Sequence, residues 1–418
     1  MEKSTVTEKK AEALPGTGFL STNYFSEKHE AFLSLGYSYD NRKSNNYNGH
    51  FSKSGSCTLA GKAEAQEGKK LLGNTTVKVS TFPQVVRKYR KYVVLNSVKS
   101  IMEGTGFRVE SCMKAVGKEV RVQKTGAVYH YGGVITCGSV WVCPVCASRI
   151  TEKRKQELQE ALDTSGFFPV LVTVTLAHKR SDALSNLLNT LNTSLRKLKA
   201  GRWWQNFAEK YGVKAHVSSL EFTYSTEKGF HPHKHLLFFL ESADADIQEF
   251  KKELTERYLY LVQKEGGYAS AFHAIDVQAG ASGAGVYLAK WGVVAEVTKS
   301  NLKEAKQEGS FSMWQLAELG ESEAWARQAF LEYAYATYGK KAITYSHGAR
   351  KALGMNKEKT DAELAEVETE VITTISRKAW KCVLLIGAQA GVLILAETKG
   401  KEAVDKFIQV LLDTFGFT

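Results

Sequence analysis

Residues 229–239, Gly-Phe-His-Pro-His-Lys-His-Leu-Leu-Phe-Phe, hold three of the chain's ten histidines within five positions. His233 and His235 are two residues apart, so both imidazoles leave the same face if this segment is a β-strand. Two imidazoles on one face of a strand are half of a metal site. The alternative is that the His-x-His pattern is incidental to the strand.

A second strand-like run, residues 216–224, comes just before the histidines and is joined to them by a short polar turn. A hairpin folded about residues 227–228 would bring Glu221 roughly opposite residues 234–235, within reach of both histidines. One carboxylate and two imidazoles suit Mg²⁺, Mn²⁺ or a similar divalent ion. We therefore predict a divalent metal ion held by Glu221, His233 and His235.

Three cysteines lie within ten positions, in Thr136-Cys-Gly-Ser-Val-Trp-Val-Cys-Pro-Val-Cys-Ala147. The two-residue gap between Cys143 and Cys146 lets both thiolates reach one tetrahedral ion, as in zinc knuckles. Cys137 supplies a third sulfur, and the fourth ligand is Cys112 or, as the weaker rival, His130. A redox pair would have the same Cys-x-x-Cys spacing, but a third cysteine in a basic segment favours structural zinc.

The chain of 418 residues carries a formal charge of +12, which favours a polyanionic partner such as nucleic acid or an anionic membrane. The start of the chain is polar, and the longest apolar run, residues 382–396, is too short to span a bilayer. We therefore expect a cytoplasmic protein with no membrane partner.

Residues 81–156 contain 14 Lys and Arg against 4 Asp and Glu, so this segment is either a solvated face or, as we predict, a DNA-binding surface. The cations assigned to that surface are Arg87, Lys88, Arg90, Lys91, Arg149, Lys153 and Arg154.

The remaining pattern predicts an α+β protein. Apolar runs and periodicity indicate strand, helix, hairpin, helix, strand and helix in turn between residues 167 and 297, with single helices at 184–208, 246–264 and 280–297. This order is typical of a central antiparallel, split β-α-β sheet with helices on one face. A zinc-knuckle module would precede the sheet and a small C-terminal α/β extension would follow it. The tail is expected to form a strand pair and then a helix at 401–412.

The predicted divisions are a disordered basic arm (1–80), the basic zinc-knuckle module (81–156), the sheet domain (157–300), a helical extension (301–379) and a C-terminal element (380–418).

Five blocks in order carry a resemblance to a known family: residues 136–147, 172–176, 220–235, Val286-Tyr-Leu-Ala-Lys-Trp-Gly292 and Tyr345-Ser-His-Gly-Ala-Arg-Lys351. Together they resemble the replication initiator (Rep) proteins of rolling-circle plasmids, members of the HUH endonuclease superfamily. The resemblance covers about residues 107–351. It implies an HUH-like fold and a site-specific endonuclease and ligase that nicks one strand at the double-strand origin. The enzyme would remain on the 5′ end as a phosphotyrosine and leave a 3′-OH primer.

The resemblance also implies roles for single residues. Tyr287 would be the nucleophile, and Lys290, one helical turn later, would stabilise the developing negative charge. Thr173 and Thr175 would line the floor of the site, and His231 would support the metal ligands. The expected partners are nicked or single-stranded plasmid origin DNA and the host helicase and polymerase.

This chain departs from two patterns found in the family: tyrosines at both positions 287 and 291, and a carboxylate at the first position with a tyrosine at the second. Some relatives carry a second tyrosine where this chain has Trp291, so one nucleophile remains and termination would use water, a carboxylate such as Glu296 or another protomer.

The rival functions are a related HUH transposase or relaxase and a non-catalytic DNA-binding protein stabilised by zinc. Only Glu221, the histidine pair and Tyr287 together argue against the non-catalytic protein.

Overall fold

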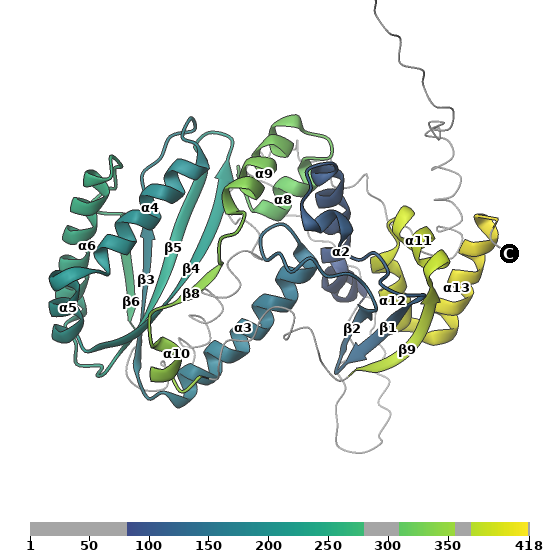
Figure 1. Ribbon diagram of the computed structural model, residues 1–418, viewed down its shortest axis with the longest axis horizontal. Coiled ribbons are helices and arrows are strands. Elements are labelled where there is room, and N and C mark those ends of the chain that lie inside the picture. The colour runs from purple at the N-terminus through teal and green to yellow at the C-terminus, as the bar shows by residue number, and fades with distance from the viewer. Residues whose placement is uncertain (1–81, 280–308, 356–368, 417–418) are drawn as a thin grey trace, which may run out of the picture. The chain divides into compact units, whose positions relative to one another are not determined.

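The computed structural model describes residues 82–279, 309–355 and 369–416 (Figure 1). Its helices in chain order are α2 (Phe82–Met102), the short 3-10 helix η2 (Arg108–Ser111), α3 (Pro144–Thr164), α4 (Leu184–Leu198), α5 (Gly201–Lys210), α6 (Ile247–Lys264), α8 (Met313–Leu319), α9 (Ala324–Thr337), α10 (Ala349–Ala352), α11 (Arg377–Leu385), α12 (Gln389–Lys399) and α13 (Lys401–Thr414). The strands are β1 (Glu119–Thr125), β2 (Val128–Gly132), β3 (Phe168–Thr175), β4 (Val213–Ser225), β5 (Gly229–Leu240), β6 (Ile275–Ala279), β7 (Ser310–Phe311), β8 (Ile343–Tyr345) and β9 (Glu370–Ser376). The predicted α+β class is confirmed.

The larger sheet positions the predicted metal ligands. Its strand order is β6-β3-β5-β4-β7, with β8 also paired to β4, and each recorded pairing is antiparallel. The two long strands β4 and β5 form the predicted hairpin at its centre. The predicted central antiparallel sheet is therefore confirmed.

Helices cover both faces of this sheet, so the prediction of helices on one face was wrong. On one face, Phe238 of β5 packs against Phe250 of α6 and Trp204 of α5. On the other face, Leu158 of α3 and Leu353, next to α10, join a cluster of buried residues from β3, β4 and β5. The reason is that residues 236–240 of β5, Leu-Leu-Phe-Phe-Leu, are apolar on both faces of the strand, so both faces need cover.

The predicted helix at 184–208 is two helices. Its leucine stripe is buried as expected, but α4 ends at Leu198 and α5 begins at Gly201. Between them Ala200 is extended, with φ of −141° and ψ of 156°, and Gly201 at φ of 74° turns the chain into the second helix. The predicted helix at 246–264 is confirmed: Asp246 caps α6 by accepting hydrogen bonds from two backbone amides. The helix predicted at 280–297 lies outside the described residues.

A second, three-stranded sheet of order β2-β1-β9 brings the segment between Cys112 and Cys137 together with the C-terminal part of the chain. Trp380 of α11 packs on Tyr131 of β2 and donates a hydrogen bond to the carbonyl of Met113 at 2.7 Å. The domain boundaries given above stay predictions. Two strands of the predicted helical extension nevertheless pair outside it: β8 pairs with β4 of the predicted sheet domain, and β9 pairs with β1 of the predicted zinc-knuckle module.

The predicted strand pair in the tail was wrong, because residues 377–399 form helices α11 and α12. Gly387, with φ of 67°, makes the turn between them, and the apolar run on each side is buried. A short apolar run has no decisive periodicity, so it suits a buried helix as well as a buried strand. Within the described ranges, no single helix is long and apolar enough to cross a bilayer; α11 and α12 pass that test only together, and they meet at a bend of 111°.

Candidate active site

The β4–β5 hairpin places Glu221 directly opposite His233. This corrects the expected register by one residue. The turn has three residues between Ser225 and Gly229, and Gly229 adopts φ of 75° close to the backbone of Arg180. A one-residue shift reverses the face of a side chain, so only the observed register puts Glu221 on the face of both histidines.

Glu221, His233 and His235 present ligand atoms that all lie within 4.8 Å of one another. Oε2 of Glu221 is 3.3 Å from Nε2 of His233 and 3.0 Å from Nε2 of His235. Glu221 and His235 are buried, and His233 is half-buried, which leaves an approach from solvent. Burial raises the pKa of Glu221, but hydrogen bonds from the two histidines and their charge outweigh it and leave the pKa at about 2. The carboxylate is thus ionised at neutral pH, as a metal ligand must be.

Neighbouring threonines and a further histidine hold the imidazoles in place. Oγ1 of Thr173 is 3.0 Å from Nδ1 of His235, and Oγ1 of Thr175 is 3.3 Å from Nε2 of His231. Nδ1 of His231 is 2.9 Å from Nε2 of His178, whose other nitrogen contacts a backbone carbonyl. The structure therefore brings the three predicted supporting residues to the site. Sequence reasoning missed His178; its only signal was its position just beyond the strand that carries the two threonines.

His231 differs from the two predicted ligands. It is not part of the Glu221 cluster, and burial together with the charges of His233, His178 and Lys228 lowers its pKa to about 4. A neutral imidazole has one donor and one acceptor nitrogen. His231 can therefore link the hydroxyl of Thr175 to the ring of His178 without adding a charge beside the metal-ligand candidates. This position suits the supporting role predicted for it.

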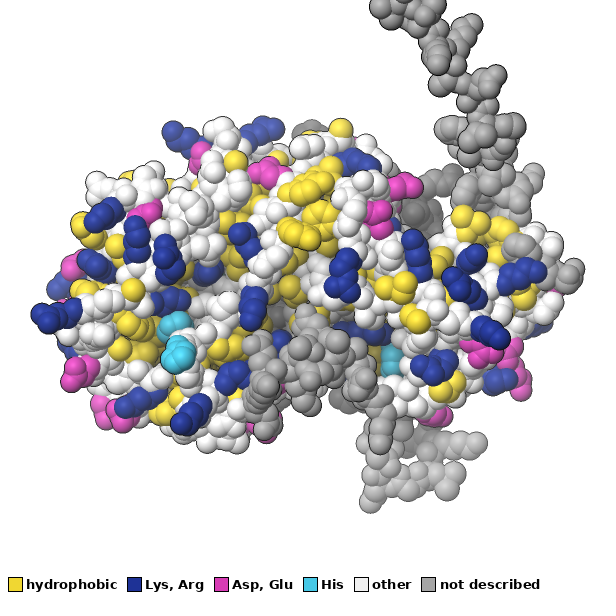
Figure 2. Space-filling view, viewed as in Figure 1, with side chains coloured by type: hydrophobic (Ala, Val, Ile, Leu, Met, Phe, Trp, Pro, Cys, Tyr) yellow, Lys and Arg dark blue, Asp and Glu magenta, His cyan; other side chains and the backbone are white. Residues whose placement is uncertain are grey.

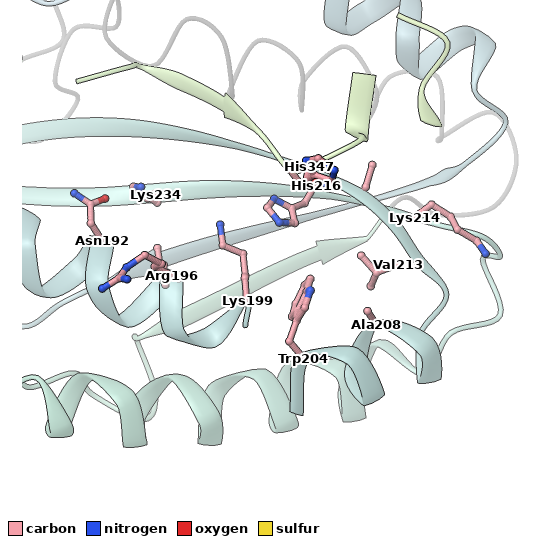
Figure 3. Close-up of a pocket in the computed structure, with 13 residues that line it drawn as sticks. Asn192, Arg196, Lys199, Trp204, Ala208, Val213, Lys214, His216, Lys234 and His347 are labelled. Atoms are coloured by element: carbon pink, nitrogen blue, oxygen red, sulfur yellow. Dashed lines mark hydrogen bonds between the residues drawn. The ribbon is translucent and has the colours of Figure 1, made fainter. Parts of the chain in front are cut away.

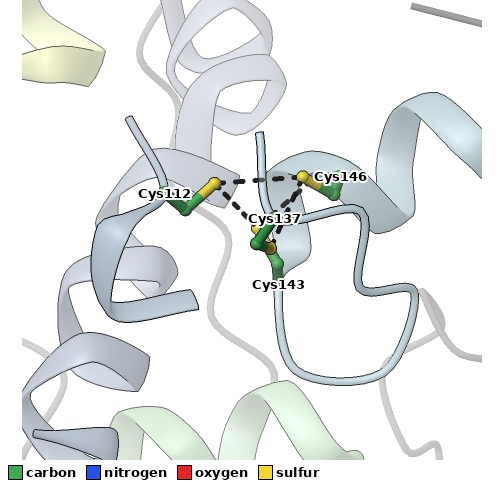
Figure 4. Close-up of side chains that lie close together, drawn as sticks. All are labelled: Cys112, Cys137, Cys143 and Cys146. Atoms are coloured by element: carbon green, nitrogen blue, oxygen red, sulfur yellow. Dashed lines mark hydrogen bonds between the residues drawn. The ribbon is translucent and has the colours of Figure 1, made fainter. Parts of the chain in front are cut away.

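The cysteines form a second cluster (Figure 4). Cys112, Cys137, Cys143 and Cys146 are all buried, with Sγ–Sγ distances of 3.6, 3.7 and 3.9 Å among the pairs in contact. Four sulfurs at ~2.3 Å around one zinc ion would lie about 3.8 Å apart. The observed cluster therefore matches a tetrahedral Cys₄ site.

Local structure explains how the cluster forms. Cys143 caps α3: its Sγ accepts a hydrogen bond from the amide of Cys146, and Pro144 occupies the first turn. Cys112 is brought from the end of η2. His130, the rival fourth ligand, lies outside the cluster, with Nδ1 3.5 Å from the carbonyl of Val128. Hydrogen bonds, first that with Cys137, lower the pKa of Cys112, whereas burial raises the pKa of Cys143.

A family model described as "Replication protein" matches residues 133–384, more than half of the chain. The chain belongs to this replication protein family. The match includes the β4–β5 hairpin, its metal-ligand candidates and three of the four clustered cysteines.

Two curated proteins are similar to this replication protein. "Protein rep" of Streptomyces lividans is 21% identical over 302 residues, which cover 55% of this chain and 66% of that protein. "Neomycin resistance protein" of Streptomyces cyanogenus is 25% identical over 132 residues, which cover 25% of this chain and 30% of that protein. The matches thus span just under two thirds of the first relative and less than a third of the second. No solved structure matches the chain.

Several cations of the replication protein that were predicted to bind DNA also contact protein groups. Lys88 and Arg90 of α2 form ion pairs with Glu397 at 2.9 Å and Glu318 at 2.6 Å. Lys91 contacts Ser148, and burial together with the charges of Arg149 and Lys88 lowers its pKa to about 8. These pairings leave less free positive charge on α2 for a polyanion.

Basic residues of α3 that were predicted to bind DNA also contact protein groups. Arg149 donates a hydrogen bond to the carbonyl of Tyr131 at 3.2 Å, and Arg154 is buried and paired with a glutamate of its own helix. Lys153 is half-buried, and the side chain of Arg87 lies outside the described part of the chain. The DNA-binding role of these residues stays a prediction. Figure 2 nevertheless shows Lys and Arg side chains spread over the visible face, with fewer Asp and Glu among them.

Tyr287 and Lys290, the predicted nucleophile and its partner, fall in residues 280–308 and lie outside the described residues. Their segment follows directly on β6, the neighbour of β3 in the sheet. Asp276 of β6 is paired with Thr173 and therefore shares the face of the metal-ligand candidates.

Proposed function

We propose that this protein is a plasmid rolling-circle replication initiator that nicks one strand of origin DNA. The observation that carries the proposal is the Glu221, His233 and His235 cluster on the central sheet of a replication protein. The strand order of that sheet also suits the split β-α-β arrangement of HUH endonucleases. The proposed partners are nicked or single-stranded origin DNA and the host helicase and polymerase, and the proposed location is the cytoplasm.

The donor set fits a catalytic Mg²⁺ or Mn²⁺, because one ionised carboxylate and two imidazoles converge from neighbouring strands. Glu221, His233 and His235 would hold the ion, which when bound polarises the scissile phosphate. Thr173 fixes the ring of His235 so that Nε2 faces the site. The Cys₄ cluster would hold zinc and fix the start of α3 against η2.

Tyr287 is the proposed nucleophile. Its phenolic oxygen attacks the phosphorus, a P–O bond to tyrosine forms, and the P–O3′ bond breaks. The phenolic proton ends on the departing 3′ oxygen, which becomes the primer hydroxyl. The new phosphodiester keeps the energy of the broken bond, so the step is reversible and supports ligation. Lys290 would stabilise the negative charge of the phenolate.

The test is incubation of the protein with single-stranded DNA from its replicon's origin and Mn²⁺. We expect a covalent protein–DNA adduct and a released 3′-OH fragment on denaturing gels, with mass spectrometry locating the DNA on the Tyr287 peptide. Tyr287→Phe should abolish the adduct, and Tyr268→Phe, an exposed tyrosine elsewhere, should keep it. A mobility shift by the wild-type protein without any cleavage would instead favour the non-catalytic DNA-binding protein.

A further inference from the structure

A pocket of about 500 Å³ lies on the sheet face opposite the metal-ligand candidates (Figure 3). It is enclosed by α4, α5, the start of β4 and the segment after β8. Lys199 and Trp204 reach from the helices toward His216 on the sheet in Figure 3. Lys234 also lines it; in β5 it lies between His233 and His235 and points to the opposite face.

The pocket is strongly basic. Its lining includes four cations, Arg196, Lys199, Lys214 and Lys234, and two histidines, and no carboxylate from the described part of the chain lines it. Lys214 pairs with Glu241 at its edge. Among the described residues, the side-chain ammonium groups of Lys199 and Lys234 have neither an ion-pair partner nor a hydrogen-bond partner.

Keeping two half-buried ammonium groups without counter-ions is unfavourable for folding alone. Burial and the charge of Lys234 lower the pKa of Lys199 to about 8, so its ammonium is disfavoured when the pocket holds no anion. Nδ1 of His216, also in the pocket, is buried without a hydrogen-bond partner among the described residues. An anion in the pocket would supply the missing partner for all three groups.

We propose that this pocket binds a nucleotide phosphate, with Lys199 and Lys234 as its principal cationic contacts. The cations would bind the phosphate oxygens, and the indole of Trp204, half-buried at the pocket wall, would pack against the base or sugar. The volume suits a mononucleotide, since small-molecule sites measure ~300–1,000 Å³. Either a free nucleotide or one unit of a DNA strand presents this chemistry. The site lies apart from the proposed nicking centre and does not depend on it.

The experiment is isothermal titration calorimetry with three probes, inorganic phosphate, dAMP and a short oligothymidylate, without added divalent ions. It is run on the wild-type protein and on His235→Ala, so that phosphate binding at the metal-ligand candidates cannot account for the signal. We expect binding by both proteins. Lys199→Met and Lys234→Met should each weaken it about tenfold or more, the loss expected for a hydrogen bond to a charged group.

Lys197→Met is the matched control, because Lys197 lies in the last turn of α4, two residues before Lys199, carries the same charge and pairs with Glu265 outside the pocket. It should bind like the wild type. If dAMP binds as well as the oligonucleotide per site, the source is a free nucleotide; if only the oligonucleotide binds, the source is a DNA strand. Wild-type affinity in both pocket variants, or no binding of any probe, would overturn the site. If those two variants do not fold, Arg196→Ala, which removes an exposed lining cation, must show the loss.

Discussion

Nδ1 of His235 lies 3.0 Å from the hydroxyl of Thr173, while Nε2 of the same ring faces Glu221 at 3.0 Å. A hydroxyl can both donate and accept, so Thr173 serves His235 whether Nε2 carries a proton or a metal ion. The two residues are directly paired across β3 and β5, which makes the contact a consequence of sheet register.

Thr173→Val tests this relationship, because valine has the same shape but no hydroxyl. Loss of such a supporting hydrogen bond typically costs 10–100-fold in metal affinity, and we expect a loss of about that size for Mn²⁺. Calorimetric Mn²⁺ titration measures it. Thr173→Ser keeps the hydroxyl and should bind Mn²⁺ like the wild type; equal loss in both variants would mean that packing, and not the hydrogen bond, is responsible.

Cys112→Ser tests the cysteine cluster. Removing one of four sulfurs should release the zinc and lower the melting temperature by several degrees or more, because metal binding contributes directly to folding. Zinc content by elemental analysis and thermal unfolding give the two readouts. Cys382→Ala, a buried cysteine outside the cluster, should retain full zinc, and so should His130→Ala. Zinc loss in His130→Ala would reinstate the histidine as a ligand.

Much of this site follows from short-range sequence patterns. The spacing of His233 and His235 fixes their common face, and the Cys-x-x-Cys pair fixes two sulfurs of the cluster, because both patterns act within one element. Cys112, preferred over His130 as the fourth ligand, lies beside the other three sulfurs, although only the tertiary fold brings it there.

Other features depend on contacts that no local pattern carries. The hairpin register depends on one extra turn residue before Gly229, and a two-residue turn fits the same sequence. Residues 382–396 lie in helices α11 and α12, which pack against α2 and the small sheet. An apolar run alone does not reveal those packing partners. The basic pocket was not predicted, because Lys199 and Lys234 are 35 positions apart and meet only across the α4–sheet interface.

Lys199 and Lys234 should make stability depend on alkaline pH in a phosphate-free buffer. Both have a pKa of about 8 in the folded protein against an ordinary value of 10.5, so the unfolded chain binds more protons between these values. The free energy of unfolding should therefore rise as pH increases from about 8 to about 10.5, by on the order of 3 kcal/mol for each lysine. Urea unfolding across this range measures it. The double variant Lys199→Met, Lys234→Met should be more stable at neutral pH and lack this rise; an unchanged rise would exclude these lysines as its origin.

His178→Ala tests the network behind His231. The substitution leaves Nδ1 of His231, which is half-buried, without its partner at 2.9 Å, at a cost of about 1–3 kcal/mol in unfolding free energy. Urea denaturation of the metal-free protein gives this value. His273→Ala removes an exposed histidine and should change stability by less than about 0.5 kcal/mol. Equal effects of the two substitutions would show that the His178–His231 contact contributes nothing.

Trp380→Phe tests whether the C-terminal helices support the cysteine cluster. Trp380 donates to the carbonyl of Met113, the residue after Cys112, and Met113 is held at φ of 68°, an uncommon conformation outside glycine. Phenylalanine keeps most of the packing on Tyr131 but leaves that carbonyl without its donor, so the position of Cys112 is less well fixed. We expect zinc to be lost to a chromogenic chelator about tenfold faster, with unchanged zinc content before chelation. Trp203→Phe, a half-buried tryptophan on α5, is the control and should leave the rate unchanged. Equal release rates for Trp380→Phe and the wild type would separate the C-terminal helices from the metal site.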